Sequence, residues 1–143
     1  MGSDSDFPVM EGCFKMLNKF GVGFKATVAS AHRTPDKAMA LARGAEAEGF
    51  KVIIAAAGLA AHLGGVLAAN TALPVIGVPC KGGALAGVDA LYATVQMPRV
   101  FPLLLLRSTA DPMPQFSLAR CSPSLILNLC RRSRITRQVS QNQ

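Results

Sequence analysis

His32 and Arg33 put a side chain that exchanges protons near neutral pH beside one that binds phosphate through paired hydrogen bonds. An apolar run at 24–29, typical of a β-strand, precedes them, and Thr34-Pro35, typical of an N-cap and a first helical residue, follows. They are therefore predicted to lie on a strand-to-helix turn, at the carboxyl end of a parallel strand, where α/β proteins bind ligands. A surface turn with two solvated side chains explains this pair alone equally well.

Residues 2–6 (Gly-Ser-Asp-Ser-Asp) form a second polar segment, directly before a predicted helix. The helix is indicated by apolar residues at three- and four-residue steps, with Asp6 as its N-cap and Gly21 as its end. The hydroxyl groups of Ser3 and Ser5, with the backbone N–H groups at such a helix start, suit an anion. A capping segment without a ligand is nevertheless the better interpretation of these residues taken alone.

The remaining elements alternate between helices and strands. The run 51–57 has no polar alternation, as expected for a parallel strand covered on both faces, and a small-residue loop at 58–65 follows it. The other expected elements are a helix at 35–49, a strand at 74–79, a glycine-rich turn at 81–87 and a helix at 88–96. This order predicts an α/β protein, a three-layer αβα sandwich with a parallel sheet and right-handed crossovers.

Three small-residue loops, at 2–6, 58–65 and 81–87, are predicted to share one rim of this sheet with the His-Arg turn. Glycines let backbone N–H groups approach a phosphate, and Arg33 offers it a bidentate partner. The predicted ligand is therefore a phosphorylated small molecule. Nucleoside triphosphates and dinucleotides are not supported, because the sequence has neither a P-loop nor a GxGxxG motif after a strand.

Charge and composition narrow the functional classes. The net charge is +7, but residues 1–98 hold eight Lys or Arg against seven Asp or Glu, so the excess lies in residues 99–143. Nucleic-acid binding is therefore not expected of the globular part. The four cysteines lack metal-ligand spacing, which favours an intracellular, reducing compartment, either cytoplasmic or organellar. No membrane span is expected, because no apolar run reaches about 18 residues.

Five segments resemble the 5-aminoimidazole ribonucleotide (AIR) carboxylase family of purine biosynthesis, which also contains the N5-carboxyaminoimidazole ribonucleotide mutases. They follow one another in family order over residues 1–98: 2–6, 30–35 (Ser-Ala-His-Arg-Thr-Pro), 60–63 (Ala-Ala-His-Leu), 73–79 (Leu-Pro-Val-Ile-Gly-Val-Pro) and 95–98 (Val-Gln-Met-Pro). The resemblance implies a flavodoxin-like parallel sheet, a homo-octamer in the intact family, and neither a metal nor another cofactor. It leaves open an ATP-dependent carboxylating partner domain.

The resemblance also implies a reaction, in which a carboxylate is installed on an imidazole carbon of AIR, either from CO2 or from the N5-carboxylated isomer. His32 would exchange the proton at that carbon. His62 would border the pocket for CO2 or the migrating carboxylate, although a structural histidine is an equally good interpretation. The remaining implied site residues are Ser3, Ser5 and Arg33 for the phosphate, Asp6 for the ribose hydroxyls, and Ser30 and Gly58 for other parts of the substrate. The alternative is an inactive fragment or a non-enzymatic module that binds phosphoribosyl ligands.

This sequence departs from the family pattern within the loops and at the start. Ala56 and Leu59 stand where the family has Gly, and Gly64 stands where it has Pro. Leu59 is expected to obstruct a position that requires a positive φ or close approach of a ligand. The family's first, central strand does not precede Met1, so we expect a sheet without it, whose two neighbouring strands have open hydrogen-bonding edges.

The resemblance stops at Pro98. Residues 99–143 contain no Gly, Lys or Glu, and Leu, Ser and Arg fill almost half of the positions. This composition favours a divergent tail, produced by a frame shift or by alternative splicing, after an incomplete AIR carboxylase-like domain at 1–98. Within the tail, residues 100–106 are predicted to form an edge strand because they are apolar.

Overall fold

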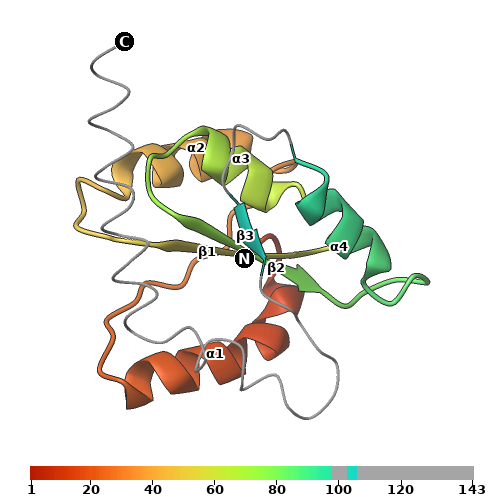
Figure 1. The fold of residues 1–143 in the computed structure, drawn as a ribbon, viewed down its shortest axis with the longest axis horizontal. Coiled ribbons are helices and arrows are strands. Elements are labelled where there is room, and N and C mark those ends of the chain that lie inside the picture. Colours follow the sequence, from red (N-terminus) through yellow and green to blue (C-terminus); the bar gives the residue numbers. More distant parts are fainter. Residues whose placement is uncertain (98–102, 106–143) are drawn as a thin grey trace.

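The fold is seen in a computed structural model, which describes residues 1–97 and 103–105. After the first helix, helices and strands follow one another in the predicted order, with one exception at residues 24–29. The elements, coloured along the sequence in Figure 1, are η1 (Asp4–Asp6), α1 (Phe7–Lys19), α2 (Pro35–Gly44), β1 (Ile53–Gly58), α3 (Leu63–Ala69), β2 (Val75–Cys80), α4 (Val88–Val95) and β3 (Leu103–Leu105).

The three strands form a parallel sheet in the order β1-β2-β3. β2 is buried along its whole length and β1 over its middle residues, as expected of parallel strands covered on both faces. In the register of the sheet, Ile53 lies opposite Val75, and Val75 lies opposite Leu103. β3 falls within the predicted edge strand at 100–106, while the rest of the predicted tail lies outside the described residues.

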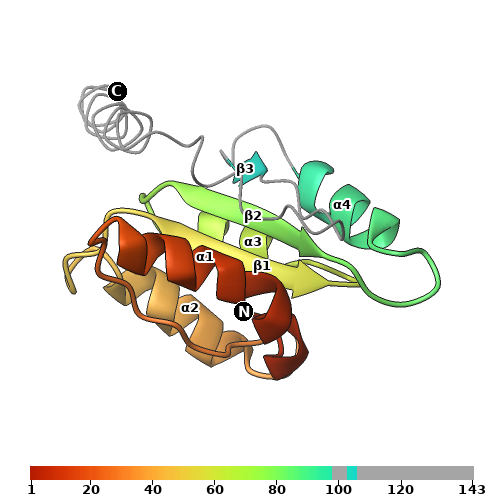
Figure 2. The same cartoon turned by 90° about the horizontal axis from the view of Figure 1, so that it is seen from below.

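Helices cover both faces of this sheet. α1 packs on one face, where Met10 joins Ala56 of β1 in an apolar cluster. α2, α3 and α4 cover the opposite face, where Ala38 of α2 and Ala90 of α4 are fully buried in a second cluster. Figures 1 and 2 show α1 on one side of the sheet and α2 and α3 on the other. The predicted three-layer αβα sandwich is therefore confirmed.

Residues 24–29, predicted to be a strand, form none. A strand needs a ladder of hydrogen bonds along its length, and within the part of the chain that the structure describes this segment has ladder bonds with Met1 alone. The terminal amino group of Met1 donates to the Thr27 carbonyl (3.0 Å), and the Ala29 N–H group donates to the Met1 carbonyl (2.9 Å). The strand prediction is wrong because the described residues ahead of α1 hold only η1. The hydrogen-bonding edges of residues 24–29 and of β1, which were expected to be open, therefore face each other.

Glycines set the ends of the first two helices. α1 ends before Gly21, whose φ of +66° closes the helix as predicted. α2 ends at Gly44 rather than at residue 49, because glycine is a poor helix former, and turns occupy residues 45–49. Asp6 and Thr34 stand at the N-cap positions of α1 and α2, as predicted, but neither side chain makes a capping hydrogen bond there, because both bond within their own loops. Among the described residues, no helix is long and apolar enough to cross a membrane.

Candidate ligand-binding site

Three loops meet at the carboxyl ends of β1 and β2, the edge of the sheet where a ligand is predicted: the first is residues 2–6, the second is the His-Arg turn at 30–35 and the third is residues 58–65. The first loop contacts β1, because the Gly2 N–H group donates to the Ala56 carbonyl (2.8 Å). The second loop contacts the first, because Nη2 of Arg33 donates to the Gly2 carbonyl (3.2 Å). The second loop contacts the third through His32 and His62. The structure thus brings together the three segments that carry the predicted site residues.

Asp6 organises the first loop. Its side chain is only 6% exposed, and Oδ2 accepts a hydrogen bond from the Ser3 N–H group (2.9 Å). The Ser3 hydroxyl donates to Oδ1 of Asp4 (2.9 Å) and accepts from the Ser5 N–H group (3.4 Å), which completes a capping box around η1. The bond from the Ser3 hydroxyl, followed by one from the Ser5 N–H group, lowers the pKa of the exposed Asp4 carboxyl. The loop is therefore fixed by its own polar groups.

Ser30 shapes the second loop. Its hydroxyl oxygen accepts hydrogen bonds from the N–H groups of His32 (3.3 Å) and Arg33 (3.1 Å). Its own N–H group donates to Oγ1 of Thr34 (2.9 Å), and that hydroxyl donates back to the Ser30 carbonyl (3.3 Å). Thr34 therefore closes the turn instead of capping α2, and Ser30 holds the backbone of the two residues predicted to do chemistry.

The two histidines are in direct contact. Nε2 of His32 and Nδ1 of His62 are 3.0 Å apart, and the rings meet edge to face at 83° with centroids 5.1 Å apart. One of these nitrogens donates and the other accepts, so the second nitrogen of each ring remains for another partner. Both side chains are exposed. The pair can therefore reach a ligand and pass a proton between its rings.

Arg33 joins the first two loops while keeping most of its donors. Only one of its five N–H groups is needed for the bond to the Gly2 carbonyl, and the side chain is exposed. A guanidinium held in this way can present a pair of parallel N–H groups to a phosphate. The Ser5 hydroxyl comes from the loop that Arg33 contacts and would be a further donor to a phosphate at this place, whereas the Ser3 hydroxyl would first have to turn away from Asp4.

Gly58 and Leu59 form the end of β1 and the start of the third loop. A Cβ atom at Gly58 would lie 3.3 Å from the Cys80 carbonyl oxygen, so β1 and β2 come this close only with a small residue here. Leu59 has a φ of +54°, in the left-handed region that favours glycine. The backbone strain expected at Leu59 is therefore present. Its side chain is 54% exposed and lies over Gly83.

Cys80 lies beside the site, although its sequence context did not single it out. The residue ends β2 and is 1% exposed, and its Sγ donates to the Val78 carbonyl oxygen (3.7 Å). Burial, followed by the negative charge of Asp6, raises the pKa of the thiol to about 12. The thiol of Cys80 therefore keeps its proton near neutral pH. Within residues 1–97 and 103–105, no group of three His, Cys, Asp or Glu side chains could hold a metal ion.

Comparisons with known proteins give relatives of this chain. The family model described as AIR carboxylase matches residues 1–110. The phosphoribosylaminoimidazole carboxylase of Saccharomyces cerevisiae is 57% identical over 103 residues, which are 72% of this chain and 18% of that protein. The N5-carboxyaminoimidazole ribonucleotide mutase of Pyrococcus horikoshii is 54% identical over 103 residues, which are 72% of this chain and 58% of that protein. The matched region thus spans less than two thirds of either relative.

A solved structure agrees with these sequence matches. The crystal structure of Treponema denticola PurE has a TM-score of 0.72 and 25% sequence identity, over 100% of this chain and 89% of that chain. This match confirms the predicted flavodoxin-like α/β fold. Because the family model covers most of the residues and the fold agrees with it, this chain belongs to the AIR carboxylase family.

Proposed function

We propose that this chain carries the substrate site of an enzyme of purine biosynthesis that converts AIR to 4-carboxy-5-aminoimidazole ribonucleotide. The contact between His32 and His62, 3.0 Å apart and beside Arg33, is the observation that carries the proposal. The carboxylate comes from CO2 or from N5-carboxylated AIR, the chemistry that the names of the Saccharomyces and Pyrococcus relatives indicate.

The first two loops bind the ribonucleotide in this proposal. The Arg33 guanidinium takes the phosphate together with the hydroxyl groups of Ser3 and Ser5. Asp6 accepts hydrogen bonds from the ribose hydroxyls with its carboxylate, which already orients the first loop through the Ser3 N–H group. The role of Ser30 is mainly to position its neighbours, because its hydroxyl oxygen already accepts two backbone N–H groups. Gly58 acts indirectly, because its missing side chain lets the ends of β1 and β2 approach closely beside the site.

The histidines handle the proton that the carboxylate replaces. The imidazole carbon of the substrate forms a bond to the carboxylate carbon, and the C–H bond at the same atom then breaks. His32 accepts that proton, and His62 orients the His32 ring or relays the proton through their shared contact. When N5-carboxylated AIR is the donor, the N–C bond breaks, and the proton that His32 takes from the ring carbon goes to that nitrogen. These steps use no cofactor.

Turnover of AIR by the purified chain tests this function. Ultraviolet absorbance would follow product formation with bicarbonate in one assay and N5-carboxylated AIR in the other. His32→Asn is expected to lower kcat/KM by roughly 10²–10⁴-fold, the usual contribution of a general acid–base group. Arg43→Lys is the control, because Arg43 bonds Asn70 away from the site. If the unaltered chain binds AIR without turnover, the enzyme proposal fails and the non-enzymatic phosphoribosyl-binding module is favoured.

We further propose that the chain self-associates, as the homo-octamers of its family do, and that α4 forms a contact surface. Exposed apolar side chains gather on α4 and on the turn before it, an arrangement typical of association sites. They are Leu85, Val88, Leu91, Tyr92 and Val95. An ATP-dependent carboxylating domain is the partner that would supply N5-carboxylated AIR.

A further inference from the structure

The contact between His32 and His62 has the spacing of a metal site. Nε2 of His32 and Nδ1 of His62 are 3.0 Å apart. Two imidazole nitrogens that bind the same zinc or nickel ion lie ~2.0–2.1 Å from it at an angle of ~90–110°, which puts them about 2.8–3.4 Å from one another. The two nitrogens are therefore already as far apart as neighbouring ligands of one metal ion.

Metal binding requires a lone pair on both nitrogens of this contact. A neutral imidazole carries one proton, which can lie on either of its nitrogens. When the protons lie on Nδ1 of His32 and Nε2 of His62, both contacting nitrogens can bind a metal ion. The rings then turn from their edge-to-face arrangement at 83° until the two lone pairs converge. Both side chains are exposed, so solvent leaves the rings free to turn.

The backbone at both histidines is held in place by hydrogen bonds. The His32 N–H group donates to the Ser30 hydroxyl (3.3 Å). The His62 N–H group donates to the Ala60 carbonyl (2.8 Å), and the His62 carbonyl accepts from the Val66 N–H group of α3 (3.0 Å). Because neither turn has to become ordered when a metal ion arrives, binding costs little backbone entropy.

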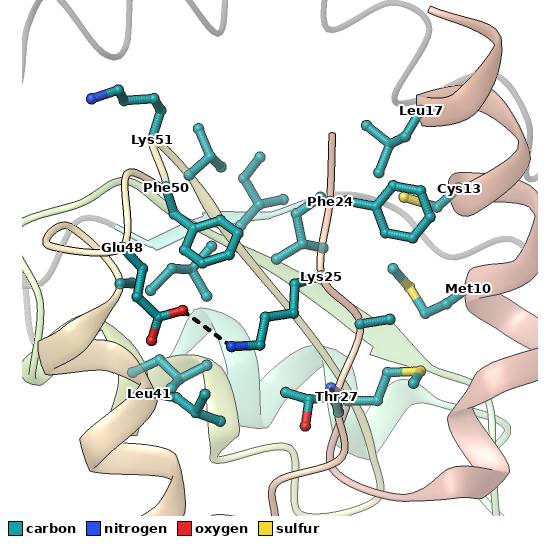
Figure 3. A pocket seen from close by; sticks show the side chains of 18 of the residues that line it. Met10, Cys13, Leu17, Phe24, Lys25, Thr27, Leu41, Glu48, Phe50 and Lys51 are labelled. Atoms are coloured by element: carbon teal, nitrogen blue, oxygen red, sulfur yellow. Dashed lines mark hydrogen bonds and ion pairs between the residues drawn. The ribbon is translucent and has the colours of Figure 1, made fainter. Parts of the chain in front are cut away.

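The free cysteines among the described residues, Cys13 and Cys80, compete poorly for such an ion. Cys80 is buried, and burial raises the pKa of the Cys13 thiol to about 11, so this thiol keeps the proton that a metal ligand must lose. Figure 3 shows Cys13 beside Met10 on α1, facing Phe24 at an apolar cavity. Neither histidine lines this cavity.

We propose that His32 and His62 together bind one Zn²⁺ or Ni²⁺ ion, and that the bound ion blocks turnover. Imidazole is a preferred ligand of these ions, whereas Mg²⁺ and Ca²⁺ prefer oxygen. Water completes the coordination shell. The Arg33 guanidinium, whose charge would repel a cation, bonds the Gly2 carbonyl (3.2 Å) and is thus held toward the first loop.

The block rests on the proposed function, whereas the binding of the metal ion does not. A metal-bound Nε2 has no lone pair left, and Nδ1 of the same ring carries the remaining proton. His32 therefore has no nitrogen with which to accept the proton from the substrate carbon. The ion occupies His62 in the same way, so that ring cannot relay a proton either.

Nuclear magnetic resonance of the untagged full chain tests the binding. Ni²⁺ is the probe, because it is paramagnetic and broadens the signals of nearby atoms. His32 and His62 are the only histidines in the sequence, so we expect Ni²⁺ to broaden the amide signals of both turns first. Excess Zn²⁺ should restore these signals, and excess Mg²⁺ should not. Broadening at neither turn or at one turn alone overturns the proposal, as does restoration by Mg²⁺.

Calorimetric titration with Ni²⁺ compares matched variants. His32→Asn and His62→Asn should each weaken binding at least about tenfold, because each leaves a single imidazole. Cys13→Ala is the control and should bind as the unaltered chain does. Cys121 and Cys130 are present in every variant, so they cannot cause a difference. Unchanged affinity in a folded histidine variant overturns the site, and so does a loss in Cys13→Ala alone. If a variant unfolds, the broadening in the unaltered chain decides.

The AIR assay tests the block separately. In the unaltered chain, Zn²⁺ should lower kcat/KM, and removal of the ion with EDTA should restore it. Turnover that continues unchanged with the metal ion bound overturns the block. A chain that binds the ion but never converts AIR overturns the proposed function, and the block with it, while it supports the metal site.

Discussion

Leu59 carries a local conformational cost at the rim of the candidate site. Its φ of +54° places a branched side chain in the left-handed region, where residues with a Cβ atom are less stable by about 1–2 kcal/mol. Leu59→Gly is therefore expected to raise the free energy of unfolding by about 1 kcal/mol, measured by urea denaturation. Leu59→Ala keeps the Cβ atom and should not give this gain. An equal gain from both substitutions would contradict a backbone origin.

Cys80 is expected to make stability depend on pH in the alkaline range. Its thiol has a pKa of about 12 in the folded chain, against an ordinary value of 9.0. Below pH 9 the thiol is protonated in both states, and its contribution to stability is fully present. As the pH rises from 9 toward 12, the unfolded chain loses the proton first, so stability falls. Urea denaturation should show a steeper fall for the unaltered chain than for Cys80→Ala, and parallel curves would contradict this prediction.

At the scale of elements, the turn before α2 depends on one hydroxyl. Ser30→Ala leaves the N–H groups of His32 and Arg33 without their acceptor, so we expect a loss of about 1 kcal/mol in stability and a lower kcat in the AIR assay. Thr71→Ala is a matched control, because its hydroxyl accepts the Leu73 N–H group in a loop outside the site. If the two variants lose activity equally, Ser30 has no positioning role.

The sequence correctly predicts those elements that a run or a spacing of apolar residues within the element itself indicates. β1 and β2 follow from continuous apolar runs, and α1 and α4 follow from helical spacing. The segment 24–29 is also apolar. A strand forms only where a neighbouring strand pairs with it, however, and the spacing of apolar residues does not show whether such a neighbour exists. Likewise, Asp6 and Thr34 stand at the N-cap positions that their residue types predict, but the sequence does not show that their side chains bond within their loops instead of to the helices.

The sequence predicts which residues form the candidate site better than it predicts how they contact one another. Parallel topology brings the loops of His32 and His62 to one rim, and the family resemblance selects both residues. Their 3.0 Å contact depends on how α2 and α3 pack on the sheet, and no spacing in the sequence encodes it. The effect of the Asp6 charge on Cys80 is not predictable from the sequence for the same reason, because it acts between the first loop and the end of β2.

At the scale of the whole molecule, the exposed apolar side chains of α4 predict self-association. Tyr92 is 57% exposed at the middle of this surface, and aromatic residues are enriched where proteins associate. Tyr92→Glu should therefore reduce the mass measured by light scattering to that of one chain, because it places an uncompensated charge in the contact. Phe20→Glu is the control, since Phe20 is 52% exposed at the end of α1 on the opposite face of the sheet. A single-chain mass for the unaltered protein would contradict self-association, and dissociation by Phe20→Glu alone would move the contact from α4 to α1.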